Sequence, residues 1–235
     1  MIVITLAGDS RRFFQEGFTE VKYKLPFRGQ TIIESILGYI PRDLKVLVVT
    51  NEKYNDVPFC KELLKKMEFK NYKVVEIQST KGQLETVIHG LRQSNDFFNT
   101  EENLTVYNGD TIRKSTTWDG FKGDGYIEVF EAEGSHWSFV DKLGKVNQVA
   151  EKHRISNYCS SGLYYFNRID LLLNNYDDYK LKGVNENELF VAPFYNYLIQ
   201  NNFEIFSSKL SVDSFIFCGT PLEYHKSLLA LDEEK

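Results

Sequence analysis

The sequence predicts an α/β protein with a mixed, mostly parallel sheet and helices on both of its faces. Three observations lead to this prediction. The chain opens on a β-branched apolar run, Ile2–Leu6, which is typical of a buried central strand. Strand-like and helix-like segments then alternate with short connections through the first half, as they do in parallel sheets. Strand-like segments of the second half follow one another without long helices, which favours antiparallel pairing there.

In the first half, continuous apolar runs mark the strands, and apolar residues at helical spacing mark the helices. The expected strands are Ile2–Leu6, Leu44–Thr50, Lys73–Ile77 and Leu104–Tyr107. The expected helices bury the apolar positions of Ile32–Ile40, which ends before Pro41, of Phe59–Met67 and of Leu84–Leu91. The segment Gly17–Gly29 is expected to be irregular.

The second half is expected to contain short strands joined by glycine-containing turns. The expected strands are Tyr126–Glu131, Trp137–Asp141, Val146–Ala150, Leu163–Phe166, Phe203–Ser208 and Phe215–Phe217. A helix is expected from about Glu188 to Gln200, and a last one begins after Pro221. Since no linker-like composition interrupts the chain, we expect one domain over residues 1–235, with a front half of about 1–115 and a back half of about 116–235 that shapes a second pocket.

Composition excludes several classes of partner and site. A formal net charge of −5 gives no overall attraction to nucleic acid or to an anionic membrane, so we expect neither as a partner. The 3 cysteines are far apart, as expected for reduced thiols in a cytoplasm rather than a disulfide scaffold. Neither a signal peptide nor a membrane-spanning run is recognisable, which favours a soluble, cytoplasmic protein.

A polar loop, Ala7–Arg12, follows the first strand directly. Its small residues let the backbone approach a ligand, and exposed backbone N–H groups suit an anion. Arg11 and Arg12 add forked donors that match phosphate oxygens. Strand, basic loop and helix together are how α/β proteins hold nucleotide phosphates at the carboxyl ends of their strands. An ordinary surface turn with two solvated arginines explains this stretch alone about equally well.

Asp110 follows the fourth strand after the turn-forming pair Asn108-Gly109. Its carboxylate is therefore expected at the same sheet edge as the Gly8–Arg12 loop. A carboxylate that faces a phosphate-binding loop commonly shares a Mg²⁺ ion with the phosphates. A turn aspartate that caps the next segment is the alternative, and it is favoured modestly when Asp110 is considered alone. Together with the basic loop, the metal interpretation is favoured.

Three further groups are candidates for ligand contact. Glu151 and Lys152 end a strand on opposite sides of the pleat, so one of them is expected to face a pocket, the glutamate toward sugar hydroxyls or the lysine toward a phosphate. Lys22 could stabilise charge that develops during phosphoryl or nucleotidyl transfer. Residues 80–83 open a helix, where backbone amides and the Gln83 side chain can meet a base or a sugar. Each also has an ordinary interpretation: a solvated strand end, a surface lysine and an N-cap turn.

The order of the short motifs is more specific than any one of them. They are LAG and DSRRF, EVKYKLPFRGQTII, TKG, NGDT, HWSFV, VAEK with RIS, SGLYYF and CGTPLEY. With these motifs the chain resembles the sugar-phosphate nucleotidyltransferases, in particular compact bacterial members found with surface-polysaccharide genes, from Ile2 to about Leu229. The resemblance implies a Rossmann-like, GT-A-like fold. It also implies in-line attack of a phosphorylated acceptor on the α-phosphate of an NTP, with release of pyrophosphate.

The resemblance also implies a role for each matching residue. The front half would bind the nucleotide and the back half the acceptor. The implied catalytic residues are Arg12 and Lys22, and the implied nucleotide-binding residues are Leu6, Ala7, Gly8, Ser10, Arg11, Gly82 and Gln83. Asp110 would bind Mg²⁺, and the implied acceptor contacts are Glu151, Lys152 and Gly162.

The chain departs from the family pattern in several places. Ser10 stands where a second glycine is usual, Asp9 adds a negative charge beside the expected triphosphate, and Val21 replaces a proline. Phe217 and Cys218 fill the place of a second metal-binding aspartate, for which Asp213 is the expected substitute.

Three functions remain open at this point. The first is a nucleotidyltransferase that activates a precursor of a capsule or another surface polysaccharide, with an NTP and a sugar phosphate or similar small phosphorylated acceptor as substrates. The second is a glycosyltransferase, although the usual Asp-x-Asp motif is reduced here to Asn108-Gly109-Asp110. The third is a catalytically degenerate nucleotide-binding module. The expected oligomeric state is a monomer or a homodimer.

Overall fold

The computed structural model describes residues 1–115, 118, 120–182 and 188–229, so residues 116–117, 119, 183–187 and 230–235 of the expected domain lie outside the described residues. Its helices are α1 (Arg11–Gln15), α2 (Ile32–Gly38), α3 (Val57–Lys66), α4 (Gln83–Arg92), α5 (Ile169–Leu181), α6 (Val191–Gln200) and α7 (Pro221–Leu229). The path of the main sheet is, in spatial order, β10 (Gly144–Lys145), β13 (Ile205–Lys209), β8 (Gly125–Glu131), β12 (Tyr158–Phe166), β6 (Leu104–Asn108), β1 (Ile2–Leu6), β4 (Val46–Asn51) and β5 (Tyr72–Ile77). Two short strands, β9 (Ser138–Val140) and β11 (Val149–Glu151), extend it from β12, while β7 (Thr111–Arg113) pairs with β14 (Phe215–Phe217) and β2 (Pro26–Phe27) with β3 (Gln30–Thr31).

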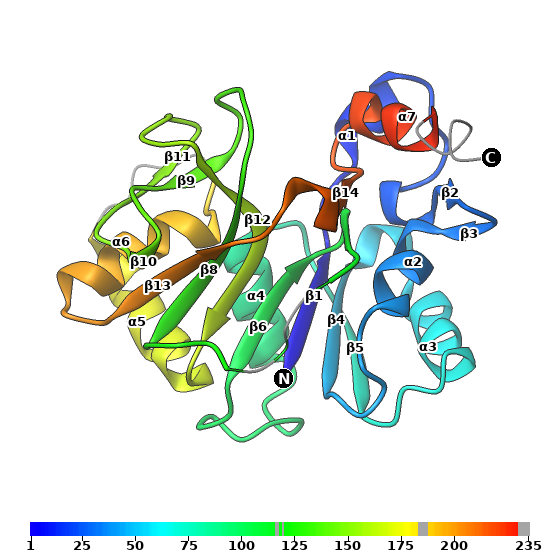
Figure 1. Cartoon of the computed structure of the whole chain (residues 1–235). Coiled ribbons are helices and arrows are strands. Elements are labelled where there is room, and N and C mark those ends of the chain that lie inside the picture. The colour runs from blue at the N-terminus through cyan, green and yellow to red at the C-terminus, as the bar shows by residue number, and fades with distance from the viewer. Residues whose placement is uncertain (116–117, 119, 183–187, 230–235) are drawn as a thin grey trace.

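The sheet is mixed, and its first four strands in chain order are parallel (Figure 1). Strand β1 lies between β4 and β6, with Ile4 opposite Val48 on one side and Tyr107 on the other. Strand β12 runs antiparallel to both β6 and β8, which joins the second half of the chain to the same sheet. This arrangement confirms the predicted α/β fold class.

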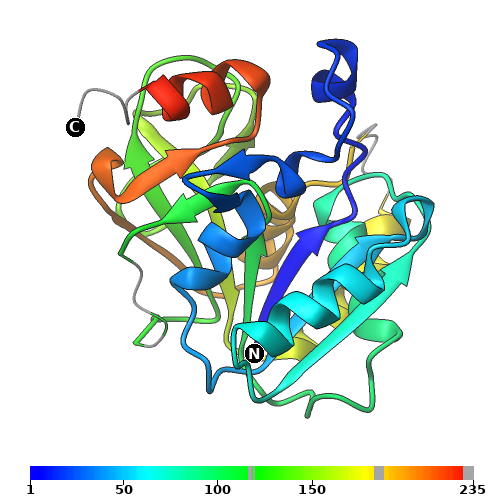
Figure 2. The same cartoon turned by 90° about the vertical axis from the view of Figure 1, so that its right-hand side faces the viewer.

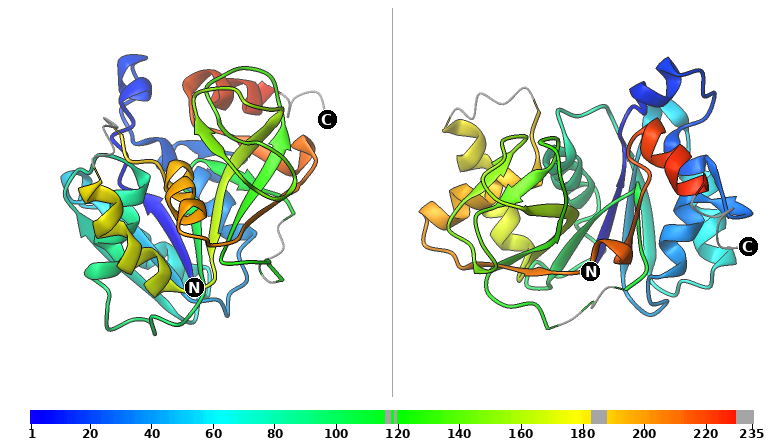
Figure 3. Two further views of the ribbon diagram at one scale, coloured as in Figure 1. Left: turned by 90° about the vertical axis from the view of Figure 1, so that its left-hand side faces the viewer. Right: turned by 45° about the horizontal axis from the view of Figure 1, so that its top comes forward.

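Helices cover both faces of the sheet. Val3 packs in a core that includes α4, α5 and α6, whereas its neighbours Ile2 and Ile4 pack in a second core under α2 and α3. Consecutive strand residues face opposite sides, so a run that is apolar throughout is what a strand buried on both faces requires. Figure 2 shows α3 in front of the parallel strands, and the left view of Figure 3 shows α5 and α6 on the other side.

The structure contains a helix that the sequence pattern did not predict, α5, at residues 169–181. Its sequence, IDLLLNNYDDYKL, is rich in Asn and Asp, which are weak helix formers. Tertiary packing overrides this weak propensity, because the ring of Tyr179 packs edge-on against Phe194 and Tyr197 of α6.

Several boundaries also differ from the prediction. Strand β12 begins at Tyr158 rather than Leu163, and α6 begins at Val191 rather than Glu188. Residues 111–113 form strand β7, which the sequence pattern did not predict, and β14 pairs with it. Within the described part of the chain, none of the helices is long and apolar enough to cross a membrane.

Candidate active site

A cleft of about 750 Å³ opens at the sheet edge where β1 and β6 end. This cleft is lined by all but one of the site residues that the sequence predicts. These lining residues are Leu6, Ala7, Gly8, Ser10, Arg11, Arg12, Lys22, Gly82, Gln83, Asp110, Glu151, Lys152 and Gly162. The exception is Asp213.

Sheet register brings the first loop and Asp110 together. Strands β1 and β6 are parallel neighbours with Thr5 opposite Asn108, so both chains leave the sheet side by side at one edge. The loop after β1 is held from the neighbouring strand, since Asn51 Nδ2 donates to the carbonyl oxygen of Ala7 over 3.1 Å. The hydroxyl of Tyr54 donates to the carbonyl oxygen of Asp9 over 3.0 Å.

The structure gives a reason for the serine at position 10, where the family pattern usually has a second glycine. Its backbone is left-handed, with φ at 51°, a conformation that glycine adopts without steric cost. The serine side chain has a use that glycine lacks, because its Oγ accepts a hydrogen bond from the backbone N–H of Lys22 over 3.1 Å. Ser10 therefore connects the segment that contains Lys22 to the basic loop, Ala7–Arg12.

The arginines of the loop lie at the start of helix α1. Arg11 Nη2 lies 3.0 Å from Asp9 Oδ2, so the negative charge of Asp9 is paired inside the loop. The Arg11 side chain is 81% exposed, and Arg12 is also exposed at the rim of the cleft. Both guanidinium groups are accessible to a ligand in the cleft.

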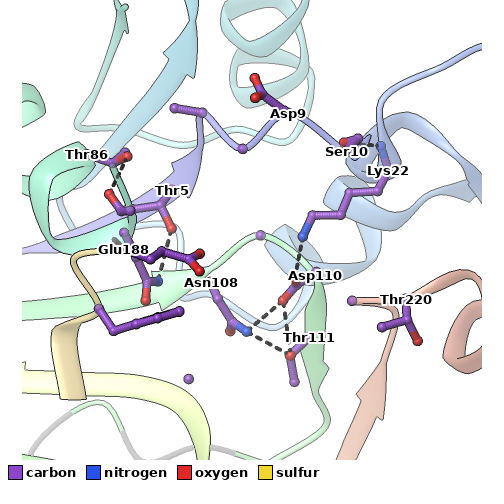
Figure 4. Close-up of a pocket in the computed structure, with 18 of the residues that line it drawn as sticks. Thr5, Asp9, Ser10, Lys22, Thr86, Asn108, Asp110, Thr111, Glu188 and Thr220 are labelled. Carbon is purple, nitrogen blue, oxygen red and sulfur yellow. Dashed lines mark hydrogen bonds and ion pairs between the residues drawn. The ribbon is translucent and has the colours of Figure 1, made fainter. Parts of the chain in front are cut away.

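Lys22 and Asp110 form the central ion pair of the cleft (Figure 4). Lys22 Nζ donates to Asp110 Oδ2 over 2.5 Å, and Asn108 Nδ2 donates to the other carboxylate oxygen over 2.6 Å. Burial alone would raise the pKa of Asp110, but the charge and hydrogen bond of Lys22, together with Arg113, lower it below its ordinary value. Asp110 is thus held as a carboxylate with both oxygens oriented.

Gly82 and Gln83 lie where helix α4 begins. Gln83 Nε2 donates to Thr5 Oγ1 over 3.1 Å, which joins the start of α4 to the end of β1. A Cβ on Gly82 would lie 2.5 Å from the carbonyl oxygen of Leu189, so only glycine fits there. The sequence predicts nucleotide contact for Gly82, but it does not reveal this packing restriction.

Glu151 and Lys152 both contribute to the lining of the cleft. The expectation that only one of them faces the pocket rested on strand alternation. Strand β11 ends at Glu151, and Lys152 has a left-handed backbone with φ at 53°, so alternation stops between them. Glu151 accepts from Ser138 Oγ, and Lys152 Nζ lies 4.4 Å from the Phe190 ring centroid and 3.4 Å from Glu188 Oε2.

Asp213 is not brought to Asp110. It lies exposed in the turn Val212–Ser214, where its backbone N–H and its carboxylate contact Ser211 Oγ. Strand β14 pairs antiparallel with β7, and the Ser214 carbonyl oxygen accepts from Lys114 N–H. At about 3.3 Å per strand residue, Asp213 lies beyond the far end of β7 from Asp110. The expected second metal ligand is therefore not in the cleft.

The sequence did not single out Glu223, a carboxylate that lies close to Asp110. A Cβ on Gly219 would be 3.3 Å from Asp110 Oδ2 and also 3.3 Å from Glu223 Oε2. Glu223 belongs to a capping box at the start of α7, in which it accepts from Thr220 N–H and donates its own N–H to Thr220 Oγ1. The Thr-x-x-Glu spacing was the sequence signal, and it indicated a helix start rather than a place in the cleft.

A magnesium ion would need phosphate oxygens of a bound substrate, in addition to protein side chains, to be held in this cleft. Among the described residues, no group of three or more His, Cys, Asp or Glu side chains could hold a metal ion by itself. Mg²⁺ commonly binds through one or two carboxylates together with substrate phosphates and water. Asp110, ionised and oriented at the edge of the basic loop, suits that kind of site.

Comparison with known proteins extends this description. No protein-family model and no curated protein matches the chain. A solved nucleoside-diphosphate-sugar pyrophosphorylase from Vibrio cholerae RC9 is 36% identical, with a TM-score of 0.88 over 97% of this chain and 100% of that one. An inositol-1-phosphate CTP transferase from T. maritima is 11% identical with a TM-score of 0.74, over 99% of this chain and 96% of that one. A UDP-glucose pyrophosphorylase complexed with UDP-glucose is 14% identical with a TM-score of 0.73, over 100% and 98% of the two chains.

Proposed function

Because the chain belongs to the family of nucleoside-diphosphate-sugar pyrophosphorylases, which are nucleotidyltransferases, we propose that it transfers an NMP group from an NTP to a sugar phosphate or a similar small phosphorylated acceptor. An acceptor phosphate oxygen attacks the α-phosphorus, the bond from that phosphorus to the bridging oxygen of the β-phosphate breaks, and pyrophosphate leaves. The observation that carries the proposal is the Lys22–Asp110 pair, which lies between the basic loop and the Glu151–Gly162 side of the same cleft.

The two sides of the cleft suit the two substrates. Backbone N–H groups and arginines of the Ala7–Arg12 loop suit a triphosphate, and Gly82 and Gln83 at the start of α4 suit the base or ribose. Glu151 and Lys152 also line the cleft, where Glu151 would accept from hydroxyl groups of the acceptor and Lys152 would contact its phosphate. This division assigns the acceptor to the back half of the chain.

Catalysis in this arrangement consists of positioning and charge neutralisation. Lys22 would stabilise the charge that builds up on the phosphates, and Arg12 would hold the leaving pyrophosphate from the rim. Asp110 would hold the Mg²⁺ ion, with the remaining ligands from phosphate oxygens and water. When bound, the ion would supply further positive charge at the reacting phosphates.

We also propose that the product is an activated precursor of a capsule or another surface polysaccharide, made in the cytoplasm by a monomer or homodimer. Support comes from the resemblance of the motifs to compact bacterial members found with surface-polysaccharide genes. The acceptor class is supported by the names of neighbours, which refer to a nucleoside-diphosphate sugar and to inositol-1-phosphate.

The test is pyrophosphate release with Mg²⁺ across ATP, CTP, GTP, UTP and dTTP, each combined with a panel of hexose, heptose and non-sugar phosphates. We expect release with a restricted set of pairs, and loss of at least about a hundredfold in kcat for Asp110→Asn. Asp213→Asn is the matched control, because it removes an exposed aspartate outside the cleft and should leave turnover unchanged.

Other outcomes would contradict the proposal. Sugar transfer from a nucleotide sugar without pyrophosphate release would favour the glycosyltransferase. Nucleotide binding by calorimetry without turnover over the whole panel would favour the degenerate module.

A further inference from the structure

Arg113 of β7 is a fully buried cation whose side chain contacts three strands of the main sheet, β6, β8 and β12. Its side chain is 0% exposed, and Nε donates to Glu128 Oε1 over 3.0 Å, with Glu128 only 3% exposed. The guanidinium carbon also lies 4.1 Å from the ring centroid of Tyr107. Removing two charges from water costs several kcal/mol per ion, and apolar replacements of such pairs are often as stable. Stability alone therefore does not explain why this ion pair is buried between β7 and the main sheet.

The bonds of Arg113 lead toward the cleft. Nη2 donates to Asn108 Oδ1 over 3.1 Å, and Asn108 Nδ2 donates in turn to Asp110 Oδ1 over 2.6 Å and to Thr111 Oγ1 over 3.0 Å. Arginine can only donate, and an ionised carboxylate can only accept. An amide between them must turn its oxygen to Arg113 and its nitrogen to Asp110. Arg113 thereby fixes which end of Asn108 meets the carboxylate.

The same guanidinium donates a hydrogen bond to the part of β12 where the pairing with β8 changes register, which is the segment proposed to contact the acceptor. The register between β12 and β8 shifts between Ser160 and Tyr164. Arg113 Nη2 donates to the carbonyl oxygen of Ser161 over 2.6 Å, and Ser161 Oγ donates to Glu128 Oε1 over 2.6 Å. The next residue, Gly162, has φ at 84°, and a Cβ there would lie 2.6 Å from Asn108 Nδ2. The irregularity and Asn108 are thus packed directly against each other.

We propose that Arg113 is a positioning residue that sets the spacing between the two sides of the cleft, through Asn108 to Asp110 and through Ser161 to the Ser160–Gly162 segment. This inference rests on the proposed function, because it takes Asp110 as the metal ligand and the β12 segment as part of the acceptor site. It follows that a change at Arg113 alters metal binding and acceptor binding together, while the contacts of the nucleotide loop stay in place.

The test uses the double variant Arg113→Met with Glu128→Gln, which leaves no unpaired charge in the sheet. Mn²⁺ binding in the presence of a non-hydrolysable NTP analogue is measured by electron paramagnetic resonance. Metal-free binding of the analogue is measured by calorimetry, and kcat and KM are measured for the acceptor. We expect about tenfold weaker Mn²⁺ binding, as for other residues that orient metal ligands, and at least about a tenfold loss in kcat/KM for the acceptor. Metal-free binding of the analogue should change less than about twofold, since the loop contacts remain.

A second variant separates the two branches. Asn108→Ala keeps the Arg113–Glu128 pair and the bond from Arg113 to Ser161, but it removes the bonds of Asn108 to Arg113, Asp110 and Thr111. It should therefore weaken Mn²⁺ binding with a smaller change in acceptor KM. This variant also decides the Asp110 branch if the double variant does not fold. Phe166→Leu, at the other end of β12, controls for lost stability, because Phe166 is 0% exposed and stacks on Tyr195 away from the network.

Folded variants with wild-type Mn²⁺ affinity and wild-type acceptor KM would overturn the inference. Equal losses in Phe166→Leu would overturn it as well, because they would show a general effect of stability. If the wild type released no pyrophosphate, the proposed function would fail, while Mn²⁺ binding would still decide whether Arg113 positions Asp110.

Discussion

Lys22 Nζ lies 2.5 Å from Asp110 Oδ2, although the two residues are 88 positions apart in the chain. Their side chains are 24% and 19% exposed. Lys22 belongs to a 3₁₀ turn beyond α1, and Asp110 follows the end of β6. The pair therefore joins the segment after the basic loop to the carboxylate at the neighbouring strand end.

We expect Lys22→Met to lower kcat for nucleotidyl transfer by about a hundredfold or more, because it removes the cation that is proposed to stabilise charge on the reacting phosphates. The free energy of unfolding should change by no more than about 1 kcal/mol, since the ion pair is partly solvated. Steady-state pyrophosphate release and urea unfolding measure the two effects. Lys24→Met is the control, because Lys24 lies in the same 3₁₀ turn as Lys22 but pairs with Asp56 and does not line the cleft. An equal loss of kcat in both variants would contradict a specific role for Lys22.

Gly82→Ala should destabilise the protein by about 1–3 kcal/mol, because its Cβ would overlap the backbone of Leu189 at 2.5 Å. Gly38→Ala is a matched substitution near the end of α2, where a Cβ meets nothing within 4 Å, and it should be neutral or stabilise by about 0.4–1 kcal/mol. Urea unfolding of both variants checks the difference. Similar stabilities would show that Leu189 moves away at little cost.

Asp9→Asn should tighten NTP binding several-fold at low ionic strength, since it removes a negative charge beside the expected triphosphate and releases Arg11 from its 3.0 Å ion pair. The gain should shrink in 1 M salt, where the screening length falls to about 3 Å. Calorimetric titration at both ionic strengths measures this, with Glu52→Gln, an exposed carboxylate outside the cleft lining, as the charge-matched control. Weaker binding by Asp9→Asn would instead show that Asp9 orients Arg11 for the ligand.

Glu85 predicts a pH dependence of stability. Burial alone would raise the pKa of Glu85, but hydrogen bonds from Lys81 N–H and Lys180 Nζ lower it below its ordinary value. A lowered folded-state pKa means that the stabilisation is complete above the unfolded-state pKa and is lost as the pH falls through the folded-state pKa. Glu85→Gln should therefore cost about 1–3 kcal/mol at pH 7 and much less in acid, as urea unfolding at several pH values would show. A gap that stayed constant with pH would contradict this assignment.

Much of the candidate site could be predicted because its residues lie next to recognisable strands. The loop after Ile2–Leu6 and the aspartate after Leu104–Tyr107 are each adjacent to an apolar run, and parallel strands end at one sheet edge. Asp213 was expected in the cleft because it is near the Gly219-Thr220 turn in the sequence, but the structure places it outside the cleft. The antiparallel pairing of β14 with β7 carries Asp213 away from that turn.

The sequence by itself determined the fold class, the order of the principal strands along the chain and a set of site residues of which all but Asp213 line the cleft. Local periodicity and the polar residues at strand ends carry part of that information, and the resemblance of the motifs to a known family supplied the rest, such as Gly162. Only the tertiary structure decided which of these residues touch, as Lys22 does Asp110, and which hidden residues support them, as Arg113 does Asn108. Such contacts depend on the spatial order and register of the strands, which arise from packing between distant segments and leave no periodic mark in the chain.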